Sequence, residues 1–181
     1  MEHEIEQIIE RCRQGSRSAQ LEMYKRYARR VYSTCLRIVG RPEEAEEVTQ
    51  DVFLKIFRKL EEGQVIDNLE GWMRQVAVNM AIDQLRRQTP ELGELPYDLV
   101  EPADDGPDEE EIQYTVEQVR EAIKRLAPGY RVVLSLYLFE GYDMDEIAQI
   151  LNLKPVSVRS QYMRAKKRLL EEISVCHPWI S

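Results

Sequence analysis

The sequence predicts an all-α protein of two small helical domains joined by an acidic, flexible linker. On both sides of the middle of the chain, apolar residues recur at three- and four-residue steps, the period of a one-sided helix. Residues 89–111, TPELGELPYDLVEPADDGPDEEE, hold ten carboxylates, four prolines and two glycines but no Lys or Arg. Prolines and repelling charges keep such a segment extended and without a core of its own.

Charge is distributed unevenly along the 181 residues. The formal net charge is -8, and setting aside the ten carboxylates of residues 89–111 leaves about +2 for the rest. The protein is therefore acidic because of its connector. We predict a first domain at 1–88, the linker at 89–111, a second domain at 112–175 and a C-terminal tail at 176–181.

The first domain is expected to contain several one-sided helices. Gly40 is placed to end the first and Pro42 to begin the next, where a cluster of Glu residues suits a helix N-terminus. A longer loop is predicted at 61–71, and a third helix at 72–88. The apolar positions expected to face inward are, in chain order, Tyr24, Tyr27, Ala28, Val31, Tyr32, Cys35, Val39, Val48, Val52, Phe53, Ile56, Phe57, Leu60, Trp72, Val76, Ala77, Met80, Ala81 and Leu85.

The second domain is expected to contain four helices. The first ends before Pro128 and Gly129, and the second, RVVLSLYLFE, is apolar nearly all round, which fits a buried helix but leaves a strand open because its start is β-branched. Asp143 with Glu146 has the spacing of a capping box for a short third helix. A tight turn through Asn152 then leads to a last helix that begins near Pro155.

The last helix has two different faces. Val158, Tyr162, Ala165 and Leu169 recur at steps of four, three and four and are expected to face inward. The opposite face then carries Arg159, Ser160, Met163, Arg164 and Lys167. A short helix, a tight turn and a basic second helix match a helix-turn-helix, which inserts its second helix into the major groove of DNA. The simpler alternative is a solvated basic face.

The sequence offers little for catalysis. Cys12, Cys35 and Cys176 are too few and too scattered for a disulfide framework or a metal site, so we expect ordinary thiols. No Gly-rich phosphate loop, nucleophile motif or metal cluster is found, so we expect no enzyme activity, cofactor or metal. No apolar run suits a signal peptide or a membrane span, so we expect a cytoplasmic protein.

Three motifs in order resemble the extracytoplasmic-function (ECF) class of bacterial RNA polymerase sigma factors, in the sigma-70 family. LEMYKRYARRVYSTCLRIVGRPEEAEEVTQDVFLKIFRKL is similar to their core-binding helices, and LEGWMRQVAVNMAIDQLRRQ to the helix that opens and recognises the minus-10 element. DEIAQILNLKPVSVRSQYMRAKKRLL is similar to their minus-35 helix-turn-helix. The resemblance implies a transcription initiation factor with sigma region 2 at 1–88 and sigma region 4 at 112–175.

The resemblance also implies roles for individual residues of the first domain. The surface that binds core RNA polymerase falls on Glu47, Gln50, Asp51 and Leu54; without the resemblance these residues would be a solvated face. Asn79 matches a base-contacting asparagine of the minus-10 helix, and the loop at 61–71 forms much of the pocket for an unstacked base. An amide suits this task because it supplies both a donor and an acceptor. Arg74, Arg86 and Arg87 are expected at phosphates, and Trp72 either stacks on a base or belongs to the core.

The resemblance also implies contacts between the second domain and the minus-35 element. The residues expected to contact bases are Arg159, Ser160, Met163 and Arg164. Those expected to contact phosphates are Lys166, Lys167 and Arg168. Two departures from the family pattern stand out. Gln75 occupies a position that is often basic, and Val156 replaces a glycine at the start of the recognition helix. We expect the sequence Lys154, Pro155, Val156 to influence which promoters are preferred.

Core RNA polymerase, promoter DNA and an anti-sigma factor, often membrane-bound, are the partners that the resemblance implies. The linker either mimics nucleic-acid charge along the RNA exit path or serves as a solubilising spacer. Two other functions remain open from the residues alone. One is a helix-turn-helix regulator that binds operator DNA unaided and uses residues 1–88 for dimerisation or signal sensing. The other is an adaptor that makes protein contacts only.

Overall fold

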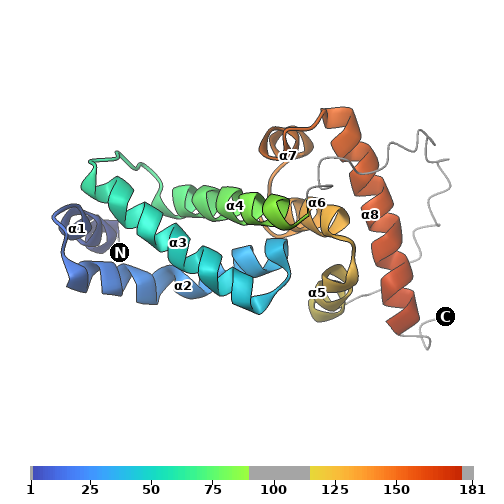
Figure 1. Ribbon diagram of the computed structural model, residues 1–181, viewed down its shortest axis with the longest axis horizontal. Helices are drawn as coiled ribbons and strands as arrows, with labels where there is room; N and C mark the ends of the chain where they lie inside the picture. The colour runs from blue at the N-terminus through green and yellow to red at the C-terminus, as the bar shows by residue number, and fades with distance from the viewer. Residues whose placement is uncertain (1, 90–114, 177–181) are drawn as a thin grey trace. The chain divides into compact units, whose positions relative to one another are not determined.

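The computed structural model describes residues 2–89 and 115–176, and every regular element in these two ranges is an α-helix (Figure 1). The predicted all-α class is confirmed. The chain divides into two compact units, Met1–Leu85 and Arg86–Ser181. Nearly all of the predicted linker, and the tail beyond residue 176, lie outside the described residues.

Four helices begin in the first unit: α1 (Glu2–Arg13), α2 (Arg17–Val39), α3 (Pro42–Glu61) and α4 (Leu69–Gln88). Gly40 ends α2 in the left-handed conformation, with φ of 80°, and Pro42 is the first residue of α3, both as predicted. Glycine suits position 40 because a residue with a side chain would be strained in the left-handed conformation. The predicted helix at 72–88 begins earlier than expected, at Leu69.

Helix α1 was not predicted individually. It lies against both α2 and α3, which pack side by side (Figure 1). Ile8 and Cys12 of α1 are buried, as are Met23, Ile38 and Ile56 of the two longer helices. The rings of Tyr24 and Phe53 meet edge to face with centroids 4.8 Å apart. Tyr24 is nevertheless 39% exposed, so its predicted inward position is only partly correct.

The two cysteines whose side chains are described are buried. Cys35 and Cys12 are both inaccessible to solvent. Burial raises the pKa of the Cys12 thiol to about 11, because an apolar surrounding disfavours the thiolate. Neither residue forms a disulfide in the described ranges, and their interpretation as ordinary thiols stays a prediction.

The described part of the second unit contains the four predicted helices α5 (Val116–Arg125), α6 (Pro128–Leu138), α7 (Met144–Leu151) and α8 (Pro155–Cys176). Residues 131–138 of RVVLSLYLFE are helical in α6, which ends at Leu138, so the strand alternative is excluded, and residues 131–136 are all buried. Pro128 begins α6 as its first residue, where a missing N–H costs nothing. Gly129, expected in the connection between the helices, lies within α6 and is buried.

Helix α8 packs against α5, α6 and α7. Its residues Ala165, Leu169 and Ile173 join Ile123 and Leu134 in one hydrophobic cluster. Tyr162 is half-buried against this cluster, and its ring lies 4.8 Å from that of Tyr137. None of the helices in the described ranges is long and apolar enough to cross a membrane.

Candidate nucleic-acid and protein interfaces

The turn between α7 and α8 is built by local hydrogen bonds. Asp143 caps α7 by accepting from the N–H groups of Asp145 and Glu146, and the Glu146 carboxylate accepts from the Asp143 N–H at 2.8 Å. This is the predicted capping box. Asn152 adopts the left-handed conformation with φ of 55° and ends α7, and α8 begins three residues later at Pro155. The helix-turn-helix prediction is therefore confirmed in its geometry.

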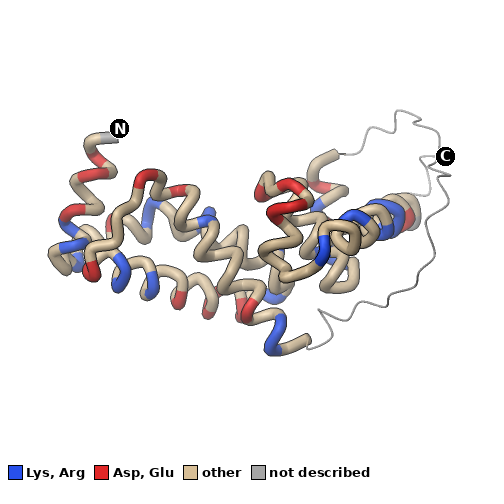
Figure 2. The backbone as a smooth tube through the Cα atoms, turned by 90° about the horizontal axis from the view of Figure 1, so that it is seen from above, with Lys and Arg blue, Asp and Glu red and all other residues tan. Residues whose placement is uncertain are grey.

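The outward face of α8 is strongly basic. Val158 and Ala165 are fully buried, and Leu169 is 7% exposed, so the predicted inward stripe fixes how the helix is rotated. Figure 2 shows Lys and Arg positions along α8. The predicted minus-35 residues fall on the remaining surface. Arg159, Met163, Lys166, Lys167 and Arg168 are exposed, and Ser160 and Arg164 are half-buried.

Two residues of α8 differ from a simple two-faced helix. Gln161 is buried to 9% exposure, although the sequence pattern did not place it inward, and its Oε1 atom has no hydrogen-bond partner. Arg159 approaches Asp145 of α7, with Nη2 and Oδ1 3.6 Å apart. That acidic neighbour was not foreseen from the sequence.

The start of α8 is well exposed. Val156, one of the two departures from the family pattern, is 69% exposed, and Lys154 and Pro155 are also exposed. A branched side chain at this position thus faces solvent and not the core. It is available to a ligand of the helix-turn-helix.

Helix α4 presents a narrow solvent face. Leu69, Met73, Val76, Ala77, Val78, Ala81, Ile82 and Leu85 are buried. Gln75 and Asn79 are exposed one turn apart, and Trp72 is half-buried one turn before Gln75. Arg74, Arg86 and Arg87 are exposed as well, the last two in the final turn of the helix.

The connection before α4 is shorter than predicted, covering residues 62–68. Asn68 caps the start of α4, since its Oδ1 accepts from the Gly71 N–H at 3.0 Å and its carbonyl accepts from the Trp72 N–H. Asn is a preferred N-cap residue, so its identity was the missed signal. A side chain at Gly71 would meet Asn68, because a Cβ there would lie 2.9 Å from Nδ2.

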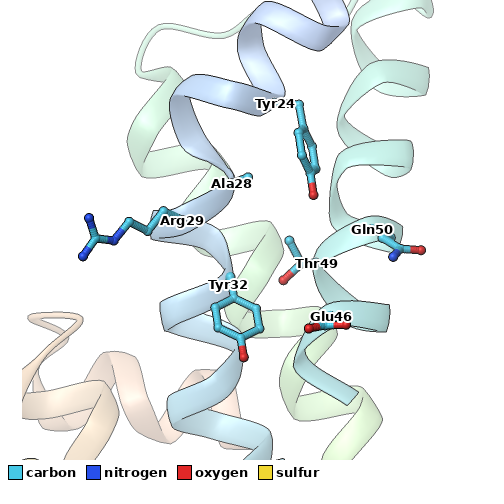
Figure 3. Close-up of a pocket in the computed structure, with 7 residues that line it drawn as sticks. All are labelled: Tyr24, Ala28, Arg29, Tyr32, Glu46, Thr49 and Gln50. Atoms are coloured by element: carbon cyan, nitrogen blue, oxygen red, sulfur yellow. The ribbon is translucent and has the colours of Figure 1, made fainter. Parts of the chain in front are cut away.

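The predicted polymerase-binding residues share one face of α3. Glu47, Gln50, Asp51 and Leu54 follow steps of three, one and three, and all four are exposed, Leu54 to 67%. Gln50 also lines an open hollow of about 490 Å³ between α2 and α3 (Figure 3). The other lining residues are Tyr24, Ala28, Arg29, Tyr32, Glu46 and Thr49.

This hollow was not foreseen, because Tyr24 and Tyr32 were assigned wholly to the inward stripe. A tyrosine has an apolar body and a polar tip, so it often lies at the edge of a core. In Figure 3 the Arg29 side chain extends away from α3, leaving the two tyrosines and Glu46 beside the hollow. In residues 2–89 and 115–176, no cluster of three or more His, Cys, Asp or Glu side chains could hold a metal ion.

Comparison with known proteins identifies both halves of the chain. The family model for sigma-70 region 2 matches residues 23–91, and that for sigma-70 region 4 matches residues 116–169. The ECF RNA polymerase sigma factor SigE of Mycolicibacterium smegmatis is 31% identical over 159 residues, covering 84% of this chain and 61% of SigE. SigW of Bacillus subtilis, also an ECF sigma factor, is 23% identical, covering 96% of this chain and 98% of SigW.

A solved structure has a similar fold. The sigma factor RpoE of Bartonella quintana, determined in complex with the anti-sigma factor NepR, aligns with a TM-score of 0.54 and 19% identity, over 85% of this chain and 96% of RpoE. Both family matches occur in the chain order that the helix-turn-helix and the α2–α4 helices led us to expect. The chain therefore belongs to the sigma-70 family of RNA polymerase sigma factors, in the ECF class, and is a transcription initiation factor.

Proposed function

We propose that this chain directs core RNA polymerase to promoters with two elements, recognising the minus-35 element with α8 and opening the minus-10 element with α4 and the preceding loop. The proposal rests on which side of α8 faces the core and which side faces solvent. Its buried stripe leaves a largely basic and polar face, which also includes the exposed Met163, on the second helix of the helix-turn-helix. Such a face suits the phosphates and base edges of a major groove.

Base contacts and phosphate contacts are assigned to different parts of that face. Arg159, Ser160, Met163 and Arg164 lie in the first three turns of α8, the part of a recognition helix that approaches base edges. Lys166 and Lys167 lie further along and are exposed, which suits contacts to phosphates. Base contacts would give sequence discrimination, and phosphate contacts affinity and salt dependence.

For the minus-10 element, Asn79 is the residue that we assign to the unstacked base. It is exposed on α4, so its amide is available on the solvent face. Trp72, half-buried at the start of the same face, offers part of its ring as a stacking surface. Arg74, Arg86 and Arg87 are assigned to phosphates.

We assign core polymerase binding to Glu47, Gln50, Asp51 and Leu54. Three polar side chains share an exposed helix face with one leucine, and such a mixture of polar and apolar groups suits a small protein interface. The hollow beside Gln50 would extend this surface toward α2. Polymerisation chemistry would belong to the partner enzyme, so we propose that the chain has no catalytic activity and acts in the cytoplasm with the polymerase.

We further propose that an anti-sigma factor holds this chain inactive. The likeness to RpoE, which was crystallised with NepR, supports this regulation. An inhibitor that covers α3 or α8 would block polymerase or promoter binding, respectively.

Reconstitution with the cognate core RNA polymerase on fragmented genomic DNA tests the proposal. We expect transcripts with defined starts that share sequence at two upstream positions, and no shift of the same DNA by the chain alone. An absence of promoter-specific transcripts would overturn the proposal. A DNA shift without polymerase would instead favour a regulator that binds an operator directly.

A further inference from the structure

The ends of α1 and α3 lie next to one another and are closed in the same way. At the end of α1, the Gly15 N–H donates to the Cys12 carbonyl and the Ser16 N–H to the Arg11 carbonyl, both at 3.0 Å. At the end of α3, Gly63 and Gln64 make the equivalent bonds to Leu60 and Lys59, also at 3.0 Å. These are two Schellman motifs.

Arg13, the last residue of α1, bridges the two ends. Its Nη2 donates to the backbone carbonyl of Gln64 at 3.1 Å, across 51 residues of sequence. Its Nη1 lies 3.4 Å from Oε2 of Glu10, an ion pair that helps to hold the guanidinium in place. The side chain is 33% exposed, but its Nε atom is buried. The guanidinium is thus set against the protein and directed at the connection between α3 and α4.

A second contact attaches the end of α3, where the connection to α4 starts, to α2. The Gln20 side chain donates to Oε1 of Glu61 at 3.0 Å, and the Gly15 Cβ position is 4.0 Å from that same carboxylate oxygen. The start of the connection is therefore attached to α1 and α2, and its end is attached to α4 through the Asn68 cap. Between the two attachments stand Val65, Ile66 and Asp67, of which Val65 is 76% exposed.

We infer that Arg13 is a positioning residue for the 65–67 loop, holding it in the conformation in which it receives an unstacked promoter base. The inference rests on the proposed function, because that function assigns the loop to the base pocket. Arg13 itself lies outside the segment matched by the region 2 model, which begins at residue 23. A short loop fixed at both ends loses less conformational entropy on binding than one fixed only at α4.

The test compares Arg13→Met with Arg11→Met in the full-length chain. Methionine keeps an unbranched apolar side chain and removes the donors. Arg11 is a matched control on the same helix, because its contacts are to Glu22 and Ser18 of α2 and not to the loop. Arg13→Lys restores one charged donor and serves as the conservative variant.

Two measurements separate positioning from stability. The first is hydrogen exchange of the amides of residues 64–67 in the free chain. The second is open-complex formation, followed by permanganate reactivity of minus-10 thymines, at a promoter recovered from the reconstituted transcription. Affinity for core RNA polymerase and the thermal midpoint are measured alongside.

For Arg13→Met we expect faster exchange in residues 64–67 and roughly threefold to tenfold less open complex, the range for losing one ordinary hydrogen bond. Core affinity is expected to stay unchanged, Arg11→Met to match the unaltered chain, and Arg13→Lys to recover part of the loss. Equal behaviour of Arg13→Met and Arg11→Met would overturn the inference, as would a parallel loss of core affinity and open complex. If the unaltered chain starts no transcripts, the proposed function fails, while hydrogen exchange still tests the loop attachment.

Discussion

Arg159 of α8 and Asp145 of α7 form an exposed ion pair across the helix-turn-helix, with Nη2 and Oδ1 3.6 Å apart. The arginine that is predicted to contact DNA thus has an acidic neighbour on the first helix of the motif. Binding of DNA has to compete with that neighbour. Because both side chains are more than 60% exposed, the pair should be weak, on the order of 0.2–1 kcal/mol.

The first prediction concerns this competition. We expect Asp145→Asn to strengthen holoenzyme binding to a minus-35 duplex by up to about fivefold, the equivalent of roughly 1 kcal/mol. Fluorescence anisotropy at two salt concentrations measures the effect. The gain should vanish when Arg159→Gln is also present. A gain that persists in the double variant would mean that Asp145 acts on DNA by simple repulsion.

The second prediction concerns Arg164. We expect Arg164→Ala to weaken minus-35 binding by about 1–3 kcal/mol, with the loss concentrated at one base pair, if the guanidinium makes a bidentate base contact. Lys167→Ala serves as the control for a phosphate contact. It should weaken all duplexes similarly and lower the salt slope by about 1. A uniform loss for Arg164→Ala across duplex sequences would reassign that residue to phosphate.

The third prediction concerns Asn79. Replacing this exposed amide with alanine should leave the thermal midpoint unchanged but reduce base discrimination at one minus-10 position, by about 1–3 kcal/mol for two lost hydrogen bonds. Gln75→Ala removes an exposed amide one turn earlier and should have little effect. Binding of fork-junction DNA with each of the four bases at the tested position measures this. Equal losses from both variants would contradict a specific role.

The fourth prediction concerns the start of α4. Gly71→Ala should gain about 0.8–1.0 kcal/mol of helix propensity, but its Cβ would displace the Asn68 cap, which is worth about 0.5–2 kcal/mol. We therefore expect Gly71→Ala to be near neutral or destabilising in the native background and stabilising when Asn68→Ala is present. Urea unfolding of the unaltered chain, the two single variants and the double variant gives the four free energies of the double-mutant cycle. The same effect in both backgrounds would show that the two residues are not coupled.

The fifth prediction concerns alkaline stability. Burial raises the pKa of Cys12 to about 11, so the folded state holds the thiol proton more tightly than the unfolded state does. The resulting stabilisation is fully present below the unfolded pKa and is lost as the pH rises toward the folded value. We expect the free energy of unfolding to fall by up to about 1.4 kcal/mol per pH unit between about 9 and 11.

The control for that experiment is Cys12→Ala, which removes the thiol but leaves the buried Tyr27, whose pKa burial also raises. The slope between pH 9 and pH 10 should flatten in this variant, while the fall above pH 10 from tyrosine should remain. Denaturant titrations at fixed ionic strength measure both slopes. An unchanged slope would show that Cys12 does not titrate in this window.

Local chemistry made much of the fold predictable. The capping box of Asp143 and Glu146, the left-handed Gly40 and the prolines at 42 and 155 each act within a few residues, so their effect can be inferred from spacing alone. The start of α4 was placed three residues late because Asn68 was not recognised as a cap. Helix α1 was missed although Ile5, Ile8, Ile9 and Cys12 follow helical spacing.

Individual contacts between helices could not be predicted from the sequence. The bond from Arg13 to the Gln64 carbonyl joins a helix end to a turn 51 residues away, and no local pattern marks either partner. The Arg159–Asp145 pair depends on how α7 and α8 cross. The buried Gln161 breaks the apolar pattern, so its burial follows only from the packing around α8. Individual contacts to DNA and to polymerase stay predictions.

Helix α8 is continuous from the proposed DNA-binding surface to the hydrophobic cluster. At 1.5 Å per residue, the 14 residues from Arg159 to Ile173 span about 21 Å, so a tilt of about 5° at Ile173 moves Arg159 by about 2 Å. A displacement of that size is enough to break a base contact. We therefore expect a core substitution at Ile173 or Leu169 to alter promoter preference by tilting α8, although both side chains are buried away from the proposed DNA-binding surface.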